Sequence, residues 1–278
     1  MEQGLYLVAT PIGNLGDMTY RGVEVLKNVD VIGAEDTRRS RVLLDHYQIK
    51  TPLLSYHEHN EAKRRPELLA RLRDGGSVAL ISDAGTPGIS DPGADLAAAA
   101  AKEGIPIHPV PGGNAVLSAV IASGLPCRRF AFEGFLPRVK KERNERLAAV
   151  SSSPLTTVLY ISPHRLREDL RDLAAACGDR PAALCREMTK LHETFYYGTL
   201  GSLRELAGEQ ELKGEMALVV AAAEGGAPPP DEATLKEEVR ALLRDGVPAK
   251  TAARIVAERY HMKKNQIYPY TIDAEEGE

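Results

Sequence analysis

Short apolar runs that alternate with helical patterns constrain the fold of this chain more than any other feature of its sequence. Each of four runs in the first half ends in a turn of Gly, Pro, Asp, Asn or similar residues, and helical patterns such as residues 64–74 and 95–102 lie between them. Strands that alternate with helices are typical of a mostly parallel sheet with helices packed on it. We therefore expect an α/β sheet whose ligands bind beyond the carboxyl ends of its strands. The runs span residues 5–9, 29–34, 78–81 and 105–110.

A second set of strand and helix patterns fills the next hundred residues or so of the chain. A stretch rich in Gly and Pro then separates this set from a few short helical patterns near the end. The second strand patterns cover residues 130–132, 157–161, 182–185 and 216–222, and helical patterns cover 142–150 and 164–176. The sequence thus predicts an α/β domain at 1–124, a second α/β domain at 125–223, a linker at 224–230, a small helical region for RNA contact at 231–270 and an acidic tail at 271–278.

The composition is that of an ordinary globular chain. Hydrophobic residues make up 43% of its 278 residues and charged residues 27%, which excludes extensive disorder and a fibrous repeat. The net charge of −4 does not by itself indicate a nucleic-acid-binding protein. The three cysteines form no CxxC pair, so a zinc knuckle is not expected. The sequence predicts a cytoplasmic protein without a signal peptide or a membrane span.

Three loops rich in glycine follow strand patterns of the first domain, at residues 10–17, 82–93 and 111–115. The middle loop holds three Gly, two Pro and two Asp, and it is longer than the roughly two to six residues that a connector needs. Glycine lets the backbone approach a ligand closely, and proline fixes the path of a loop. The first loop has neither a GxxxxGK[ST] motif nor a GxGxxG motif, which disfavours an ATPase and a Rossmann dehydrogenase. Together the loops predict a small-molecule cleft at one edge of the sheet.

Two short charged segments could carry chemistry or lie in solvent. His57 and His59 alternate with Glu58 at a spacing that a metal could use, but no further ligand can be assigned. A polar surface is the favoured interpretation there, and no metal site is predicted. Residues 187–193 place Glu, Lys, His and Glu after a strand pattern. A solvated loop and side chains that point into a cleft are equally good interpretations of that segment.

Basic residues cluster locally although the chain as a whole is acidic. Residues 128–146 contain seven Lys or Arg against three Glu, and residues 246–270 contain five against one. Two tyrosines, Tyr268 and Tyr270, lie close to the lysine pair in the second cluster. Solvated helix faces and contact with RNA or phosphate explain such clusters equally well.

A series of longer motifs carries a resemblance to a known family. The order and length of these motifs make the resemblance highly specific, and it covers roughly residues 4–222. The chain resembles the bacterial ribosomal RNA small subunit methyltransferase I family, the 16S rRNA cytidine 2′-O-ribose methyltransferases. The motifs are LVATPIGNL at 7–15, AEDTR at 34–38, SYHEHN at 55–60, SDAGTPGISDPG at 82–93, FEGFLP at 132–137, SPHR at 162–165 and REMTK at 186–190.

This resemblance implies the tetrapyrrole-methylase fold, with two α/β domains and a cofactor cleft between them. It implies S-adenosylmethionine (SAM) as cofactor and a homodimer as the usual assembly. The substrate that it implies is a decoding-centre cytidine of 16S rRNA within the assembled small ribosomal subunit. Two alternatives stay open at this point: a SAM methyltransferase acting on a tetrapyrrole of the precorrin type, and a non-catalytic ribosome assembly factor.

Candidate site residues follow from the resemblance and from charge and position. Methyl transfer to a hydroxyl needs alignment of the reacting atoms and can use a general base, but it needs no metal. The predicted cofactor-binding residues are Pro11, Gly13, Asp83, Ala84, Gly85, Thr86, Ile89, Ala115 and Val116. The predicted catalytic residues are Asp36, Glu187, Lys190 and Glu193. The predicted RNA-binding residues are Arg38, Arg138, Lys140, Lys141, Arg143, Lys263 and Lys264.

Overall fold

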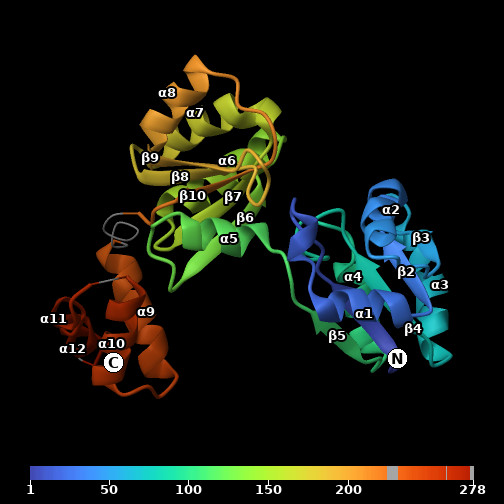
Figure 1. The fold of residues 1–278 in the computed structure, drawn as a ribbon. Helices are drawn as coiled ribbons and strands as arrows, with labels where there is room; N and C mark the ends of the chain where they lie inside the picture. Colours follow the sequence, from blue (N-terminus) through green and yellow to red (C-terminus); the bar gives the residue numbers. More distant parts are fainter. Residues whose placement is uncertain (224–230, 261, 276–278) are drawn as a thin grey trace. The chain divides into compact units, whose positions relative to one another are not determined.

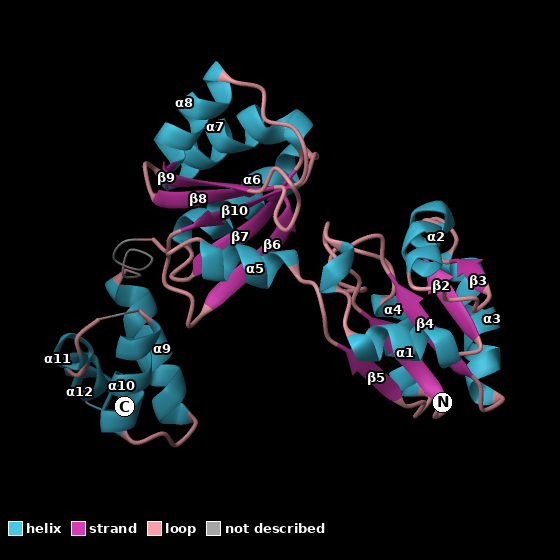
Figure 2. Ribbon diagram, viewed as in Figure 1, coloured by secondary structure: helices cyan, strands magenta, loops and turns pink. Residues whose placement is uncertain are grey.

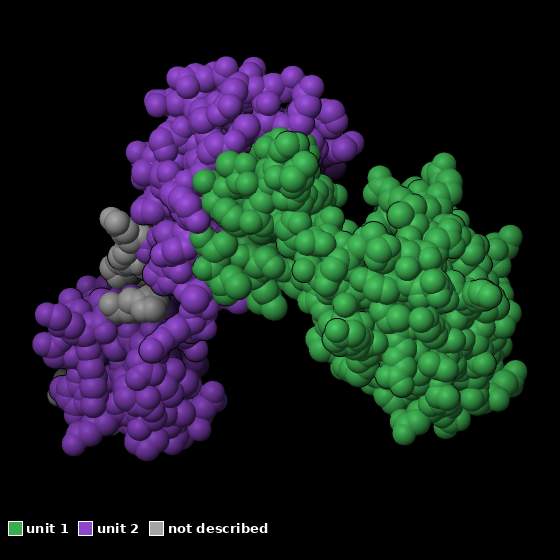
Figure 3. Space-filling model, viewed as in Figure 1, with its two compact units in different colours: residues 1–122, 185–195, 214–217 green, residues 123–184, 196–213, 218–278 purple. Residues whose placement is uncertain are grey.

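The structure is a computed structural model that describes residues 1–223, 231–260 and 262–275 (Figure 1). The linker predicted at 224–230 lies outside the described residues. The chain divides into two compact units (Figure 3). Unit 1 comprises Met1–Ala122, Cys185–Phe195 and Gly214–Ala217, and unit 2 comprises Ser123–Leu184, Tyr196–Lys213 and Leu218–Glu278.

A five-stranded sheet forms the centre of unit 1 (Figure 2). Its strand order is β3-β2-β4-β1-β5, and every neighbouring pair is parallel. The predicted α/β sheet is confirmed, and the four predicted runs are four of its strands. The fifth, β3, was not predicted, because its three residues give too short a pattern. The strands are β1 (Gly4–Val8), β2 (Val31–Ala34), β3 (Leu53–Ser55), β4 (Ser77–Ile81) and β5 (Ile107–Val110).

Two separate hydrophobic cores cover the two faces of this sheet. Successive side chains of a strand point to opposite faces, so Ala79 and Leu80 of β4 belong to different cores. The first core joins the sheet to α1 (Tyr20–Asn28) and α2 (Thr37–His46). The second joins it to α3 (Glu61–Arg73) and α4 (Ala94–Lys102). Both faces are therefore buried, which explains why β1, β2 and β4 consist of continuous apolar runs.

A second five-stranded sheet has the order β6-β7-β10-β8-β9, and its first two strands are parallel. The four predicted strands of this region are confirmed, whereas β9 and the helix after it were not predicted. The strands are β6 (Phe130–Phe135), β7 (Thr156–Ile161), β8 (Pro181–Arg186), β9 (Thr194–Thr199) and β10 (Met216–Val220). The helices are α5 (Ala115–Ala122), α6 (Lys140–Ser152), α7 (Leu166–Cys177) and α8 (Leu200–Glu209), with short 3₁₀ turns at Leu15–Asp17 and Pro163–Arg165.

The last described part of the chain is a group of short helices with its own core. They are α9 (Glu232–Arg244), α10 (Ala249–Arg259), α11 (Lys264–Ile267) and α12 (Pro269–Glu275). Buried Leu235, Val239 and Val256 form the centre of that core. Because α12 continues to Glu275, the helical region extends past its predicted end at 270 into the segment predicted as a tail. Within the described residues, we find no helix with the length and apolar character needed to cross a membrane.

Candidate cofactor and catalytic site

The loops after β1 and β4 are locked together by a short antiparallel bridge. The backbone N–H of Thr10 donates to the Gly85 carbonyl at 2.8 Å, and the N–H of Gly85 donates back at 3.1 Å. The Thr10 hydroxyl also donates to the Ser82 carbonyl at 3.2 Å. Gly85 has a φ of +84°, a left-handed conformation that glycine adopts without strain. These contacts fix both loops at the carboxyl edge of the sheet.

The loop after β5 joins this pair and completes a three-loop cradle, formed by residues 10–13, 82–86 and 112–114. The Thr86 hydroxyl donates to the Gly113 carbonyl, and the side-chain amide of Asn114 donates to Thr86 Oγ1, both at 3.3 Å. A Cβ atom at Gly113 would lie only 2.7 Å from the Thr10 carbonyl oxygen. A glycine is thus needed there because two backbones approach each other closely.

A pocket of about 240 Å³ opens at this cradle. This volume lies below the roughly 300–1,000 Å³ typical of ligand sites, so the pocket can hold only part of a cofactor. Apolar side chains and the Asp83 carboxylate share its wall, an arrangement that suits a ligand with a flat apolar part and a positive charge. The lining residues are Thr10, Pro11, Ile12, Gly13, Leu15, Arg39, Val42, Leu43, Asp83, Ala84, Lys190 and Glu215.

The predicted cofactor-binding residues occupy four different places in the structure. Pro11, Gly13, Asp83 and Ala84 line the pocket, and Gly85 and Thr86 belong to the cradle beside it. Ile89 is partly exposed. Ala115 and Val116 form the first turn of α5, where the Val116 side chain is buried.

Three carboxylates that follow β2 and β4 influence one another beside this pocket. The Asp83 N–H lies 3.4 Å from Glu35 Oε2, and Asp83 itself accepts from the N–H of Asp36 and pairs with Arg39 at 3.2 Å. Burial raises the pKa of Glu35. Burial, together with the charge of Glu35, raises the pKa of Asp91 to about 6. Glu35 and Asp91 were missed as site residues, although both stand within motifs quoted from the sequence.

The raised pKa of Asp91 predicts a pH-dependent stability. Folded Asp91 keeps its proton up to about pH 6, whereas an ordinary aspartate loses it near 3.8. The folded state then binds more protons in this window, so the free energy of unfolding should fall as pH rises through it. We expect Asp91→Asn to remove this fall and to be more stable than the parent at pH 7 by about 1–2 kcal/mol, after allowance for solvent screening.

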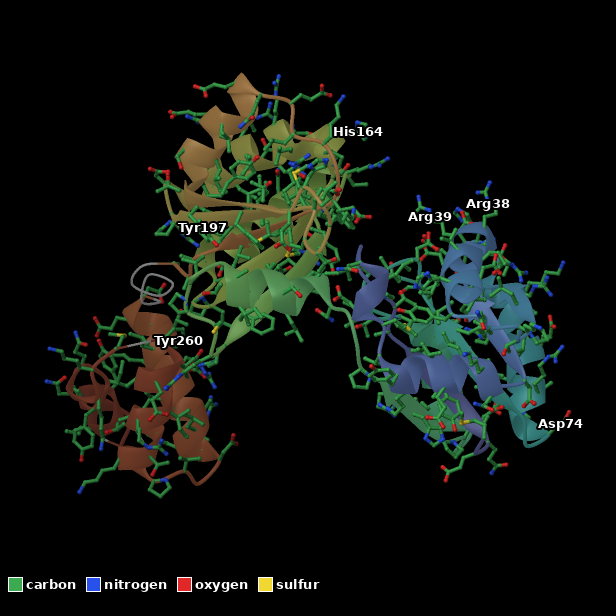
Figure 4. All side chains as sticks on the ribbon, in the orientation of Figure 1. Arg38, Arg39, Asp74, His164, Tyr197 and Tyr260 are labelled. Atoms are coloured by element: carbon green, nitrogen blue, oxygen red, sulfur yellow. The ribbon has the colours of Figure 1, made fainter. Side chains whose placement is uncertain are left out.

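Urea titrations at several pH values test this expectation. Asp74→Asn is the matched control, because Asp74 lies exposed at the end of α3 (Figure 4). Parallel pH profiles for the parent and Asp91→Asn would show that Asp91 does not cause the dependence.

Lys190 is the one predicted catalytic residue that lines the pocket. Its ammonium group lies 2.8 Å from Glu187 Oε1 and 2.7 Å from Glu215 Oε2. Burial alone would lower the pKa of Lys190, but the hydrogen bonds to these two carboxylates raise it overall, so the side chain stays cationic. A Cβ atom at Gly13 would lie 2.5 Å from Lys190 Cγ, which shows how closely the lysine stem covers the first loop of the cradle.

The three predicted catalytic carboxylates make structural contacts in the described fold. Asp36 caps α2 by accepting from the N–H of Arg38 at 2.8 Å, and hydrogen bonds from Arg38 lower the pKa of Asp36 to about 2. Burial would raise the pKa of Glu187, but hydrogen bonds from Lys190 and the N–H of Glu215 lower it overall. Glu193 accepts from the N–H of Thr189 at 2.6 Å. The structure therefore groups Glu187 with Lys190 and places Asp36 beside Asp83, and the pKa values of Asp36 and Glu187 are lowered and not raised toward neutrality.

The comparisons with known proteins agree with this geometry. Residues 4–204 match the model of the family described as Tetrapyrrole (Corrin/Porphyrin) Methylases. A ribosomal RNA small subunit methyltransferase I from a Synechocystis strain is 46% identical over 277 residues, which are 98% of this chain and 98% of that protein. Another from Escherichia coli O157:H7 is 43% identical, over 97% of this chain and 94% of that protein. The chain belongs to the ribosomal RNA small subunit methyltransferase I family.

Solved structures confirm the tetrapyrrole-methylase fold expected of this family. A cobalt precorrin-4 methyltransferase has a TM-score of 0.61 at 18% identity, covering 78% of this chain and 94% of its own. A uroporphyrin-III C-methyl transferase from Thermus thermophilus, complexed with S-adenyl homocysteine, has a TM-score of 0.57 at 19% identity, covering 78% of this chain and 97% of its own. At these identities the likeness shows the fold alone.

The prediction that Arg143 binds RNA, which was based on the family resemblance and on charge, is wrong. Arg143 is only 6% exposed. Its guanidinium lies 2.7 Å from Asp169 and 2.8 Å from Asp172, and it also donates to the Pro137 carbonyl. An arginine that is buried and paired in this way supports α6 and the loop before it and is not presented to a nucleic acid.

The other predicted RNA-binding residues are on the surface. Arg38 is 89% exposed at the start of α2, next to Arg39 (Figure 4). Arg138, Lys140, Lys141, Lys263 and Lys264 are also exposed. His57 and His59 lie in the turn after β3, and the described side chains contain no group of three or more possible metal ligands.

Proposed function

We propose that this chain transfers a methyl group from SAM to the ribose 2′-hydroxyl of a decoding-centre cytidine in 16S rRNA, on the assembled small ribosomal subunit. The observation that carries this proposal is the likeness over nearly the whole chain to relatives named ribosomal RNA small subunit methyltransferase I. The three-loop cradle supports it, because its closely packed glycines and the Asp83 carboxylate fit a cofactor of this kind.

Within this proposal, the residues of unit 1 bind and align the reactants. SAM, when bound, supplies an electrophilic methyl group. Pro11, Gly13 and Ala84 would hold its flat part, and Asp83 would accept from a positively charged group. Alignment of this kind can supply much of the rate enhancement, since effective molarities for well-oriented groups reach about 10⁵–10⁸ M.

Lys190 is the residue that we assign to the reaction itself. Methyl transfer forms a carbon–oxygen bond on the ribose, breaks the methyl carbon–sulfur bond of SAM to leave a neutral thioether, and releases the hydroxyl proton to solvent water. Negative charge develops on the 2′-oxygen as that proton leaves, and a fixed cation stabilises it. Glu187 and Glu215 hold the Lys190 ammonium in place, so they are positioning residues.

Mass mapping of ribose methylation in small-subunit RNA tests the proposed function. We expect a strain without this protein to lack one 2′-O-methylcytidine near the decoding centre, and a plasmid copy of the chain to restore it. An unchanged methylation map in the deletion strain would overturn the proposal. A missing tetrapyrrole methylation with intact rRNA would favour the tetrapyrrole methyltransferase instead.

We also propose a homodimer, as the family resemblance implies. Leu117 and Ile121 stand one turn apart on α5 and are exposed, so an apolar strip is present for a second copy to cover. Light scattering should give twice the chain mass of 30.1 kDa at micromolar concentration. A measured mass equal to that of one chain would contradict the proposed dimer. Leu117→Glu should shift the equilibrium from the dimer toward the monomer.

A further inference from the structure

An open groove lies on the C-terminal helices, among residues that the proposed cofactor and catalytic site does not use. Its volume is about 620 Å³, within the range typical of ligand sites. The groove is lined by Lys250, Lys264, Asn265, Tyr268, Pro269 and Ile272. Three of these residues offer apolar or aromatic surface, two carry positive charge, and one has an amide that both donates and accepts hydrogen bonds.

The positive charge at the groove is not balanced within the described side chains. Two arginines of α10 have carboxylate partners: Arg254 lies 3.0 Å from Glu258, and Arg259 lies 2.7 Å from Glu238. Neither Lys250 nor Lys264 has such a partner among the side chains that the structure describes, and both are exposed. The groove thus presents two cations to a negatively charged ligand.

The aromatic ring in the groove is held in place by the fold. Tyr268 packs against the core of the helical region, and its N–H donates to the Lys264 carbonyl at 2.9 Å. The neighbouring tyrosines have other contacts: the hydroxyl of Tyr260, which is labelled in Figure 4, bonds to Glu238, and the Tyr270 ring lies 5.6 Å from the Lys236 ammonium. Tyr268 is therefore the tyrosine placed to stack with a ligand, and little conformational freedom is lost when it does so.

We propose that this groove binds unpaired nucleotides of the rRNA substrate. A base stacks on Tyr268 against the apolar side chains of Pro269 and Ile272, and the flanking phosphates lie against Lys250 and Lys264. Double-stranded RNA offers mainly phosphates and 2′-hydroxyls to a protein, whereas unpaired bases can stack on aromatic side chains. The aromatic and apolar floor therefore favours a single strand. This inference rests on the proposed function, and it adds a second RNA contact remote in sequence from the catalytic residues.

Two variants of the full-length protein separate the stacking and charge contributions. Affinity for a short single-stranded RNA is measured by fluorescence anisotropy over a salt series. Tyr268→Leu keeps apolar volume but removes the ring, and we expect roughly 5- to 150-fold weaker binding with an unchanged salt slope. Lys250→Gln combined with Lys264→Gln should reduce the slope of log affinity against log salt by about 1.4, since two phosphate contacts are lost.

Lys236→Gln is the matched control, because it removes the same kind of charge from α9 but does not line the groove. Unchanged RNA affinity and salt slope in the groove variants would overturn the inference. Weaker binding to small subunits with unchanged binding to the RNA alone would point to a protein ligand and also overturn it. Calorimetry with SAM and the methylation map of the parent test the proposed function separately, so the two can fail independently.

Discussion

Alanine at Lys190 is expected to lower the single-turnover rate of methyl transfer by about 100- to 1,000-fold at saturating SAM and small subunit. Lys190 is the only predicted catalytic residue among those that line the described pocket, and its pKa is raised by two carboxylates, so it carries a fixed positive charge. Losing that charge removes stabilisation that matters most in the transition state. SAM affinity, measured by calorimetry, should change far less than the rate.

A panel of related variants makes this expectation specific. Lys190→Arg keeps the charge and should recover part of the rate. Lys213→Ala removes an exposed lysine that pairs with Glu211 and should leave the rate unchanged. The carboxylate variants Asp36→Asn, Glu187→Gln and Glu193→Gln complete the panel. If Lys190→Ala and all three of these stay within about tenfold of the parent, catalysis depends on alignment alone and our assignment is wrong.

Alanine at Gly113 is expected to weaken SAM binding by about 10- to 100-fold, because it forces two loops of the cradle apart. Its Cβ would lie 2.7 Å from the Thr10 carbonyl and 3.4 Å from the backbone nitrogen of Ile12. Thr10 cannot move away freely, because it is held by two backbone hydrogen bonds to Gly85. Calorimetric titration with SAM measures the effect.

Gly208→Ala is the control for this substitution. Gly208 lies in α8, and a Cβ there would meet no heavy atom within 4 Å. This variant should bind SAM as the parent does and should be no less stable, since alanine favours a helix more than glycine does. Equal SAM affinity in Gly113→Ala and Gly208→Ala would show that the cradle does not bind the cofactor.

The sequence by itself determined the main strands and the sheet edge at which the candidate site lies. Strands such as β1 and β4 are buried on both faces, so they must be continuous apolar runs, and such runs can be read locally. Glycine and proline at the ends of those runs likewise indicate a particular local backbone conformation. The loops at Thr10 and Gly85 could therefore be predicted from the sequence. The alternation of strand and helix patterns gave the α/β class, whereas the family motifs carried the tetrapyrrole-methylase fold and the cofactor, which no physical pattern in the chain would have supplied alone.

Strands that are defined mainly by pairing with a neighbouring strand were not predicted from the sequence. β3 has three residues, and it is defined by its pairing with β2, which includes Gly33 opposite Leu54. β9 lies at the edge of its sheet, where polar and aromatic residues replace the apolar run typical of a central strand. In both cases the neighbouring strand supplies the information that the local pattern lacks.

Only the tertiary structure decided which charged residues are available for function. It buried Arg143 between two aspartates, brought Lys190 against Gly13 although the two are distant in the sequence, and raised the pKa of Asp91 through burial and a nearby glutamate. Charge can be counted in a sequence, but burial and pairing depend on contacts between distant segments. The energy of an ionised group depends strongly on its solvation and on its nearest charges, so packing determined the roles of these residues.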